Sequence, residues 1–276
     1  MELTRASALI EGIAVATRRW RVAAVRREQG IFVGTAPARF AAVRAVPFLR
    51  GLFVHFVEAP GELQWSATAP GPPPEVLPRN GWRSPFAIFM MLAWAHGLPQ
   101  LALHFAAPSV ATASWTFQVA VLAIQLAVFL LYLRLIQRVK GMSRVFQYAG
   151  AFKKALWQLR SPRPELRDQP GWHWHSSTIA VVLSLAMVAV AAGELLPRLS
   201  LGGWMTLFVR VGLTLLAFSA ANEIQIVLTK LGPSLPMRVL FAPLLLVDRI
   251  GTGTPDDEML EVANACIAKL RALESE

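Results

Sequence analysis

The sequence predicts a mainly α protein of the membrane: a four-helix transmembrane bundle, a small N-terminal β element and a cytoplasmic C-terminal helix. Composition is the first reason, because 55% of the 276 residues are apolar and only 16% are charged, whereas soluble domains carry about 25% charged residues. The second reason is that four long segments are almost free of charge. The third is that Lys and Arg residues gather in one loop between these segments.

The N-terminal region, residues 1–58, is predicted to be a cytoplasmic β/α region. Two turn signals, Arg18-Arg19 and Glu28-Gln29-Gly30, separate three stretches rich in strand formers. These stretches are residues 8–16, 21–27 and 31–33. Residues 38–58 are predicted to form a partly amphipathic helix. Residues 59–81 include three consecutive prolines and are predicted to be a Pro/Gly-rich linker.

Residues 82–230 are predicted to form a membrane domain with four spans. The spans are residues 85–107, 115–133, 176–193 and 199–222. About 20 apolar residues are needed to cross the hydrocarbon layer, and each segment meets that length within a few residues. The only charged residue within them is Arg210. Tryptophans, which favour the headgroup region, stand at the segment starts: Trp82, Trp115, Trp172, Trp174 and Trp204.

The distribution of Lys and Arg predicts the orientation. The loop 134–175 carries nine of them, the linker between the first two spans carries none, and the linker between the last two carries only Arg198. The positive-inside rule therefore places both termini and the loop 134–175 in the cytoplasm. Because this basic loop lies beside two spans, we expect it to contact anionic lipid headgroups of the bilayer rather than nucleic acid.

The C-terminal region, residues 231–276, is predicted to hold an interfacial segment and a cytoplasmic helix. Residues 234–248 are apolar but too short to cross, and prolines interrupt them, so they suit the membrane interface or the side of the bundle. Residues 255–275 are predicted to form a helix capped by Thr254. Its apolar stripe is Leu260, Ala263, Ile267 and Leu270.

Polar residues within the spans are candidates for function, because burying them in a membrane is costly. Arg210 lies near the middle of the fourth span, with Glu194 and Glu223 as possible partners. A structural buried pair and a path for a substrate or ion remain open alternatives. His96 and His104 lie eight residues apart in the first span, so they face similarly. They are candidates for function or for hydrogen bonds between helices.

Three stretches of the chain suggest a family. They are residues 8–12, Ala-Leu-Ile-Glu-Gly; residues 47–51, Pro-Phe-Leu-Arg-Gly; and residues 254–263, Thr-Pro-Asp-Asp-Glu-Met-Leu-Glu-Val-Ala. In this order they resemble the YqhQ-like family of bacterial membrane proteins, which have no assigned function and are often labelled predicted metal-dependent enzymes. The resemblance implies the bacterial cytoplasmic membrane. It also implies a polar cluster of Glu11, Arg50 and Glu223 at the membrane surface.

The metal label of that family rests on a cytoplasmic motif, His-Gly-Ala-Glu-His-Lys-Thr, after the second span. Here Ala149, Phe152 and Lys153 stand where the family has His, Glu and His. A later Cys-Gly-Thr-Ser-Phe motif is also absent, and residues 171–175 read Gly-Trp-His-Trp-His there. Imidazole and carboxylate are the usual ligands of divalent metals. The chain is therefore predicted to lack the family's metal site and to use no cofactor.

His173 and His175 remain as an alternative metal pair at the cytoplasmic start of the third span. They show no third ligand at a recognisable spacing, so we expect them mainly to anchor the chain at the interface. The leading functional hypothesis is a non-catalytic membrane subunit, scaffold or assembly partner of a larger envelope complex. It would contact a membrane-protein partner or a second copy of itself. The alternative is a membrane-bound metal-dependent enzyme with relocated ligands. A small transporter using Arg210 is disfavoured because the four spans show no internal repeat.

Overall fold

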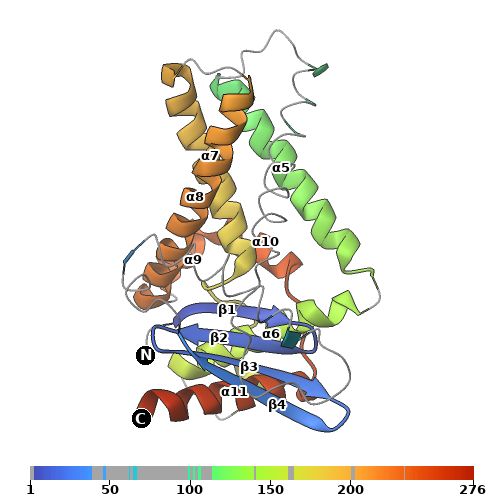
Figure 1. Cartoon of the computed structure of the whole chain (residues 1–276). Helices are drawn as coiled ribbons and strands as arrows, with labels where there is room; N and C mark the ends of the chain where they lie inside the picture. The colour runs from blue at the N-terminus through green and yellow to red at the C-terminus, as the bar shows by residue number, and fades with distance from the viewer. Residues whose placement is uncertain are drawn as a thin grey trace.

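The computed structural model describes residues 3–38, 114–139, 141–160, 165–199, 203–232 and 234–276, with isolated positions between 46 and 106. Three long helices stand side by side above a layer formed by a sheet and two further helices, and both chain ends lie in that layer (Figure 1). The strands are β1 (Leu3–Leu9), β2 (Gly12–Thr17), β3 (Trp20–Arg27) and β4 (Gly30–Pro37). The described helices are α5 (Trp115–Ile136), α6 (Met142–Arg160), α7 (Ser177–Leu199), α8 (Gly203–Leu231), α9 (Leu235–Leu240), α10 (Ala242–Ile250) and α11 (Asp257–Ser275), with a 3₁₀ turn at Leu166–Asp168.

The four strands form an antiparallel sheet in the order β1-β2-β3-β4. Leu9 pairs with Gly12, which leaves Ile10 and Glu11 as a two-residue turn. Glu11 has a φ of 55°, in the left-handed region that such tight hairpins require. A Cβ atom on Gly12 would lie 2.1 Å from the carbonyl oxygen of Ala24. The predicted single strand 8–16 is therefore wrong, because the chain reverses at Glu11. The turn predicted at residues 18–19 is confirmed, and the turn predicted at residues 28–30 is confirmed for residues 28–29, because Gly30 already begins β4.

One face of the sheet packs against α6 and α11 and forms the larger hydrophobic core. Alternate strand residues such as Ile13, Val15 and Val22 point to this face, as the two-residue period of a strand requires. From α6 the core receives Tyr148, Ala151, Phe152, Ala155 and Leu156. We call this unit, β1–β4 with α6 and α11, the sheet domain. The loop 134–175 is therefore largely helical, and α6 is built into the sheet domain.

The predicted C-terminal helix is confirmed as α11, and its predicted apolar stripe is buried against the sheet. The predicted cap is wrong. The side chain of Asp256, not Thr254, accepts a hydrogen bond from the backbone N–H of Met259 at 2.8 Å. Thr254 lies too early in the chain because Pro255 and Asp256 still precede the helix.

The opposite face of the sheet is also covered. Its buried residues include Leu9, Ala14 and Val25, and Trp65 packs against them. Arg21 and Glu62 form a buried ion pair with an N–O distance of 3.8 Å. Glu62, Trp65 and Ser66 are helical positions within the range predicted to be a linker, so at least this part of it lies against the sheet.

Three helices are long and apolar enough to cross a membrane: Trp115–Ile136, Ser177–Leu199 and Phe208–Leu231. The protein is thus mainly helical, with three candidate spans among the described residues. The first predicted span, residues 85–107, lies outside the described residues apart from isolated positions, as does the predicted helix 38–58. On α5, Val119, Val128 and Leu131 are more than half exposed, which fits a helix whose outer face contacts lipid.

Candidate functional site

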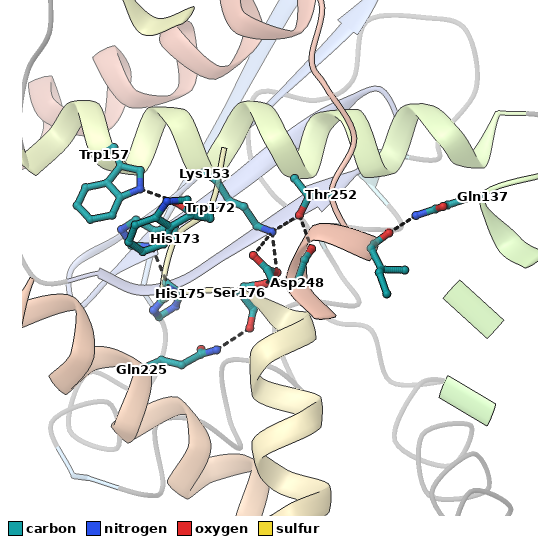
Figure 2. A network of polar contacts seen from close by, with 11 residues as sticks. Gln137, Lys153, Trp157, Trp172, His173, His175, Ser176, Gln225, Asp248 and Thr252 are labelled. Atoms are coloured by element: carbon teal, nitrogen blue, oxygen red, sulfur yellow. Dashed lines mark hydrogen bonds and ion pairs between the residues drawn. The ribbon is translucent and has the colours of Figure 1, made fainter. Parts of the chain in front are cut away.

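A buried lysine marks the place where the sheet domain meets the candidate spans. Lys153 lies on α6 beside Phe152, which packs into the core of the sheet domain. Its side chain is only 1% exposed and points away from the sheet toward α10 (Figure 2). A lysine is almost never fully buried unless it is paired, so its surroundings identify a built polar site.

Lys153 forms an ion pair with Asp248 at the end of α10. Its Nζ donates to both carboxylate oxygens of Asp248 at 2.8 Å and also to Oγ1 of Thr252. Burial lowers the pKa of Lys153 from its ordinary value, while the charge and hydrogen bonds of Asp248 act in the opposite direction. The three donors of the ammonium group therefore meet three oxygen acceptors.

Asp248 extends this contact to the candidate spans. The hydroxyl of Ser176, the residue before α7, donates to Asp248 Oδ1 at 2.5 Å. The backbone carbonyl of Ser176 accepts a hydrogen bond from Nε2 of Gln225 on α8 at 2.5 Å. At the end of α5, Nε2 of Gln137 donates to the carbonyl of Ile250.

We call the side chains of Gln137, Lys153, Ser176, Gln225, Asp248 and Thr252 the polar junction. These residues come from α6, from all three candidate spans or their ends, and from α10 and the loop after it (Figure 2). Helix α10 is the common element, since the sheet domain and the candidate spans are both hydrogen-bonded to it or to the residues beside it.

Glycines allow the backbones to approach closely around the polar junction. A Cβ atom on Gly150 of α6 would lie 2.2 Å from the carbonyl oxygen of Gly253, and one on Gly251 would lie 2.5 Å from Oγ1 of Thr178 on α7. The backbone N–H of Gly253 donates to the carbonyl of Phe146 on α6 at 2.7 Å. The loop after α10 is therefore held between α6 and the first turn of α7.

His173 and His175 lie next to the polar junction and are buried. Nδ1 of His173 accepts a hydrogen bond from the backbone N–H of His175 at 3.0 Å, and the His173 ring lies 5.1 Å from that of Trp157. Trp174 is 1% exposed and contacts Trp172 and Phe241 edge to face. This segment is packed inside the protein, in contrast to the predicted interfacial anchor.

The residues at the positions of the family's metal motif do not fit a metal ion. Phe152 belongs to the hydrophobic core, and Lys153 presents an ammonium group that already occupies the carboxylate of Asp248. In the part of the chain that the structure describes, no three His, Cys, Asp or Glu residues form a group that could hold a metal ion.

Arg210 is buried within α8, at 1% exposure, and lies opposite α5. Its Nη2 donates to Oε1 of Gln118 on α5 at 2.6 Å. Of the two carboxylates proposed as partners, Glu194 forms an ion pair with Arg198, four residues along α7, at 3.0 Å, and Glu223 lies further along α8. The partner that the structure gives Arg210 is thus a neutral amide from another helix.

The remaining site residues predicted from the sequence do not belong to the polar junction. Glu11 accepts two hydrogen bonds from Nε of Arg144 on α6, at 2.7 and 2.9 Å, so it fastens the first hairpin to that helix. Arg50, His96 and His104 lie outside the described residues. Among the basic residues of the predicted lipid-binding loop, Lys154 donates to the carbonyls of Arg167 and Gln169, and Arg167 pairs with Asp257.

Residues 46–273 match a family described as proteins of unknown function, DUF1385. The chain belongs to this family. No curated protein and no solved structure is detectably similar to it. The range shared with DUF1385 contains all six residues of the polar junction and begins after the four strands of the sheet.

The polar junction was missed from the sequence, although two of its residues carry a signal. The pair Lys153-Lys154 interrupts an apolar run, with Phe152 before it and Ala155, Leu156 and Trp157 after it. Asp248 is the single acidic residue between Glu223 and Asp256. Each observation alone fits a solvated charge, and only the fold brings these two positions of the DUF1385 chain together.

Proposed function

We propose that this DUF1385 protein is a non-catalytic integral membrane subunit, a scaffold or assembly partner within a larger envelope complex. The polar junction carries the proposal. It hydrogen-bonds the sheet domain to α10, α10 to the end of α5 and to Ser176 before α7, and Ser176 to α8, so the two halves of the molecule are held in a defined relation. A scaffold requires such a fixed relation between its membrane part and the domain that it presents.

The bonding of Lys153 supports a structural role for the site. A lysine that acts as a nucleophile or base needs a free electron pair on its nitrogen. Here the nitrogen donates to three oxygens, and Asp248 keeps the charged form paired. Breaking a buried pair of this kind by removing one partner costs about 3–5 kcal/mol, so both side chains contribute to holding the fold together.

The membrane arrangement that goes with this proposal has four spans, with the sheet domain and both termini in the cytoplasm of a bacterium, as in the YqhQ-like family. One observation supports a further crossing before α5. The sheet ends at Pro37 below the candidate spans, whereas Trp115 begins α5 at their opposite end (Figure 1).

The partners that this role implies are the lipid bilayer, with anionic headgroups, and a membrane-protein partner or a second copy of the chain. Purification from native membranes in a mild detergent, followed by mass spectrometry, tests this. We expect defined chains, or a homo-oligomer, to co-purify with the wild type and with Arg167→Gln. Lys153→Met should lose them. A protein that is monomeric in every preparation would contradict the proposal.

Metal analysis of the same samples tests the alternative of an enzyme with relocated ligands. His173 and His175 are the alternative metal pair that the sequence offers, so they are the side chains to examine. Near-stoichiometric metal that is lost in a His173→Ala, His175→Ala double variant would favour the enzyme over the scaffold. We expect metal at background level in both proteins.

A further inference from the structure

The segment from α9 to α10 exposes a run of large apolar side chains. Leu235 is 72% exposed, Val239 68%, Leu240 69% and Leu246 64%. Leaving apolar area in water costs about 25 cal/mol per Å², and soluble proteins rarely expose contiguous apolar patches of this kind. These residues therefore need a covering that is apolar.

The two sides of α10 differ sharply. Asp248 is fully buried and directed at Lys153 and Ser176, whereas Leu246 points outward. The polar side of the segment thus faces the protein and its apolar side faces away. This is the reverse of an ordinary surface helix in water and is expected of a helix that lies between a protein and lipid.

The position of the segment identifies what covers it. Helix α10 packs beside α5 and α7, near the end of α5 where Gln137 contacts Ile250. Helix α9 begins shortly after α8 ends at Leu231. The outward side chains at those span ends, Leu135 on α5 and Leu231 on α8, are also more than half exposed. The apolar surface of α9 and α10 therefore continues the outer surface of the candidate spans.

The charges of the segment complement a phosphate layer. Residues 231–251 contain two basic residues, Arg238 and Arg249, and one acidic residue, the buried Asp248. Both arginines are exposed, and the guanidinium carbon of Arg238 lies 5.4 Å from the ring centre of Trp172. Such stacking holds an arginine in place while its donors still reach outward.

We infer that α9 and α10 form an in-plane membrane-binding surface, with their leucines and Val239 among the acyl chains and with Arg238 and Arg249 at the phosphates of anionic lipids. The occupant is the bilayer that surrounds the spans. This goes beyond the scaffold role, because it assigns the segment a direct lipid contact whether or not a protein partner exists.

Spin labelling of the purified protein in vesicles tests the inference. The native thiol of Cys266 is fully buried, so a label attaches selectively to a new surface cysteine. Leu240→Cys is compared with Val128→Cys on the outer face of α5 and Lys269→Cys on the exposed side of α11. The vesicles contain phosphatidylcholine and phosphatidylglycerol, and the readout is the accessibility of the label to oxygen and to a soluble nickel chelate.

We expect the label at residue 240 to be reached better by oxygen than by the nickel chelate, at a depth between those of residues 128 and 269. A label that is as accessible to nickel as the one at residue 269 would overturn the inference, because the surface would then face water. A label shielded from both reagents would also overturn it, because protein would then cover the surface.

The headgroup contact is tested in the same system. Arg238→Gln should move the label at residue 240 toward water in vesicles that contain phosphatidylglycerol, and should leave it in place in pure phosphatidylcholine. If the label at residue 240 lies at the same depth with and without Arg238→Gln in both vesicle types, Arg238 does not bind anionic lipid.

Discussion

At the residue scale, the molecule contains two kinds of ion pair that differ in their surroundings. Lys153 and Asp248 are each 1% exposed, whereas Arg167 and Asp257 are 65% and 71% exposed. Exposed pairs contribute about 0–1 kcal/mol because water and salt screen them. A buried pair contributes little relative to apolar residues of the same shape, but leaves an uncompensated charge when one partner is removed.

This contrast predicts the effect of Lys153→Met. The variant should lose about 3–5 kcal/mol of stability, because the carboxylate of Asp248 stays buried without its cation. Adding Asp248→Leu should recover most of the loss. Arg167→Gln is the matched control and should shift the apparent melting temperature little. Thermal unfolding in detergent measures all four proteins, and a double variant no more stable than Lys153→Met would contradict the explanation.

Arg210 leads to a different expectation, since its partner on α5 is the neutral Gln118. Loss of either side chain leaves a buried polar group without this bond, which costs about 1–3 kcal/mol. Arg210→Met and Gln118→Met should therefore each destabilise the protein, and the double variant should cost less than their sum. A double-mutant cycle on melting temperature measures the coupling. If the double variant loses as much stability as the two single variants together, the contact between Arg210 and Gln118 contributes no coupling energy.

At the element scale, close packing of α6 against the loop after α10 depends on Gly150. Alanine is the better helix former by about 1 kcal/mol, so Gly→Ala in a helix is normally favourable. Gly150→Ala should nevertheless destabilise the protein, because its Cβ would lie 2.2 Å from the Gly253 carbonyl oxygen. Gly212→Ala on α8 is the control, since a Cβ there meets nothing within 4 Å. Thermal unfolding should therefore show opposite signs for the two substitutions.

The buried thiol of Cys266 reports whether α11 stays packed against the sheet. Burial raises the pKa of the Cys266 thiol to about 12. Because the folded pKa lies above the ordinary value of 9.0, the neutral thiol favours the folded state below that pH, and this contribution is lost as the pH rises toward 12. Alkylation by iodoacetamide at about pH 9, where roughly half or more of a free thiol is thiolate, should be negligible in native protein. It should be rapid in denaturant, and fast labelling of native protein would show that α11 detaches readily.

The elements differ in how far the sequence predicts them. Long apolar segments predict α5, α7 and α8, because a helix that is so long and apolar is expected to lie in the hydrocarbon layer of a membrane. The amphipathic stripe of α11 predicts its buried face. The first hairpin was missed, because Glu11 is not a usual residue for a left-handed turn and the β-rich stretch looks continuous. The polar junction was missed because its members lie up to 115 positions apart, from Gln137 to Thr252, and a lone charge in an apolar sequence does not reveal its partner.

At the scale of the whole molecule, the sheet domain lies entirely at one end of the candidate spans (Figure 1). The proposed topology predicts that a cysteine at Leu199, at the far end of α7, reacts with an impermeant maleimide in intact cells. A cysteine at Lys269 on α11 should react only after the cells are opened. The buried native thiol does not interfere. Labelling of residue 269 in intact cells would show that the protein has the opposite orientation to the proposed one.

The core of the sheet domain joins elements that the ribosome synthesises far apart in time. It joins Val22 of the third strand to Cys266 of α11, 244 residues later, where the thiol contacts the Val22 carbonyl oxygen. When the candidate spans have been synthesised, the strands and α6 already exist, but α11, the second helix on their common face, does not. Part of this face of the sheet therefore stays uncovered until α11 is made. A chain truncated before α11 should keep that part uncovered and open to proteolysis.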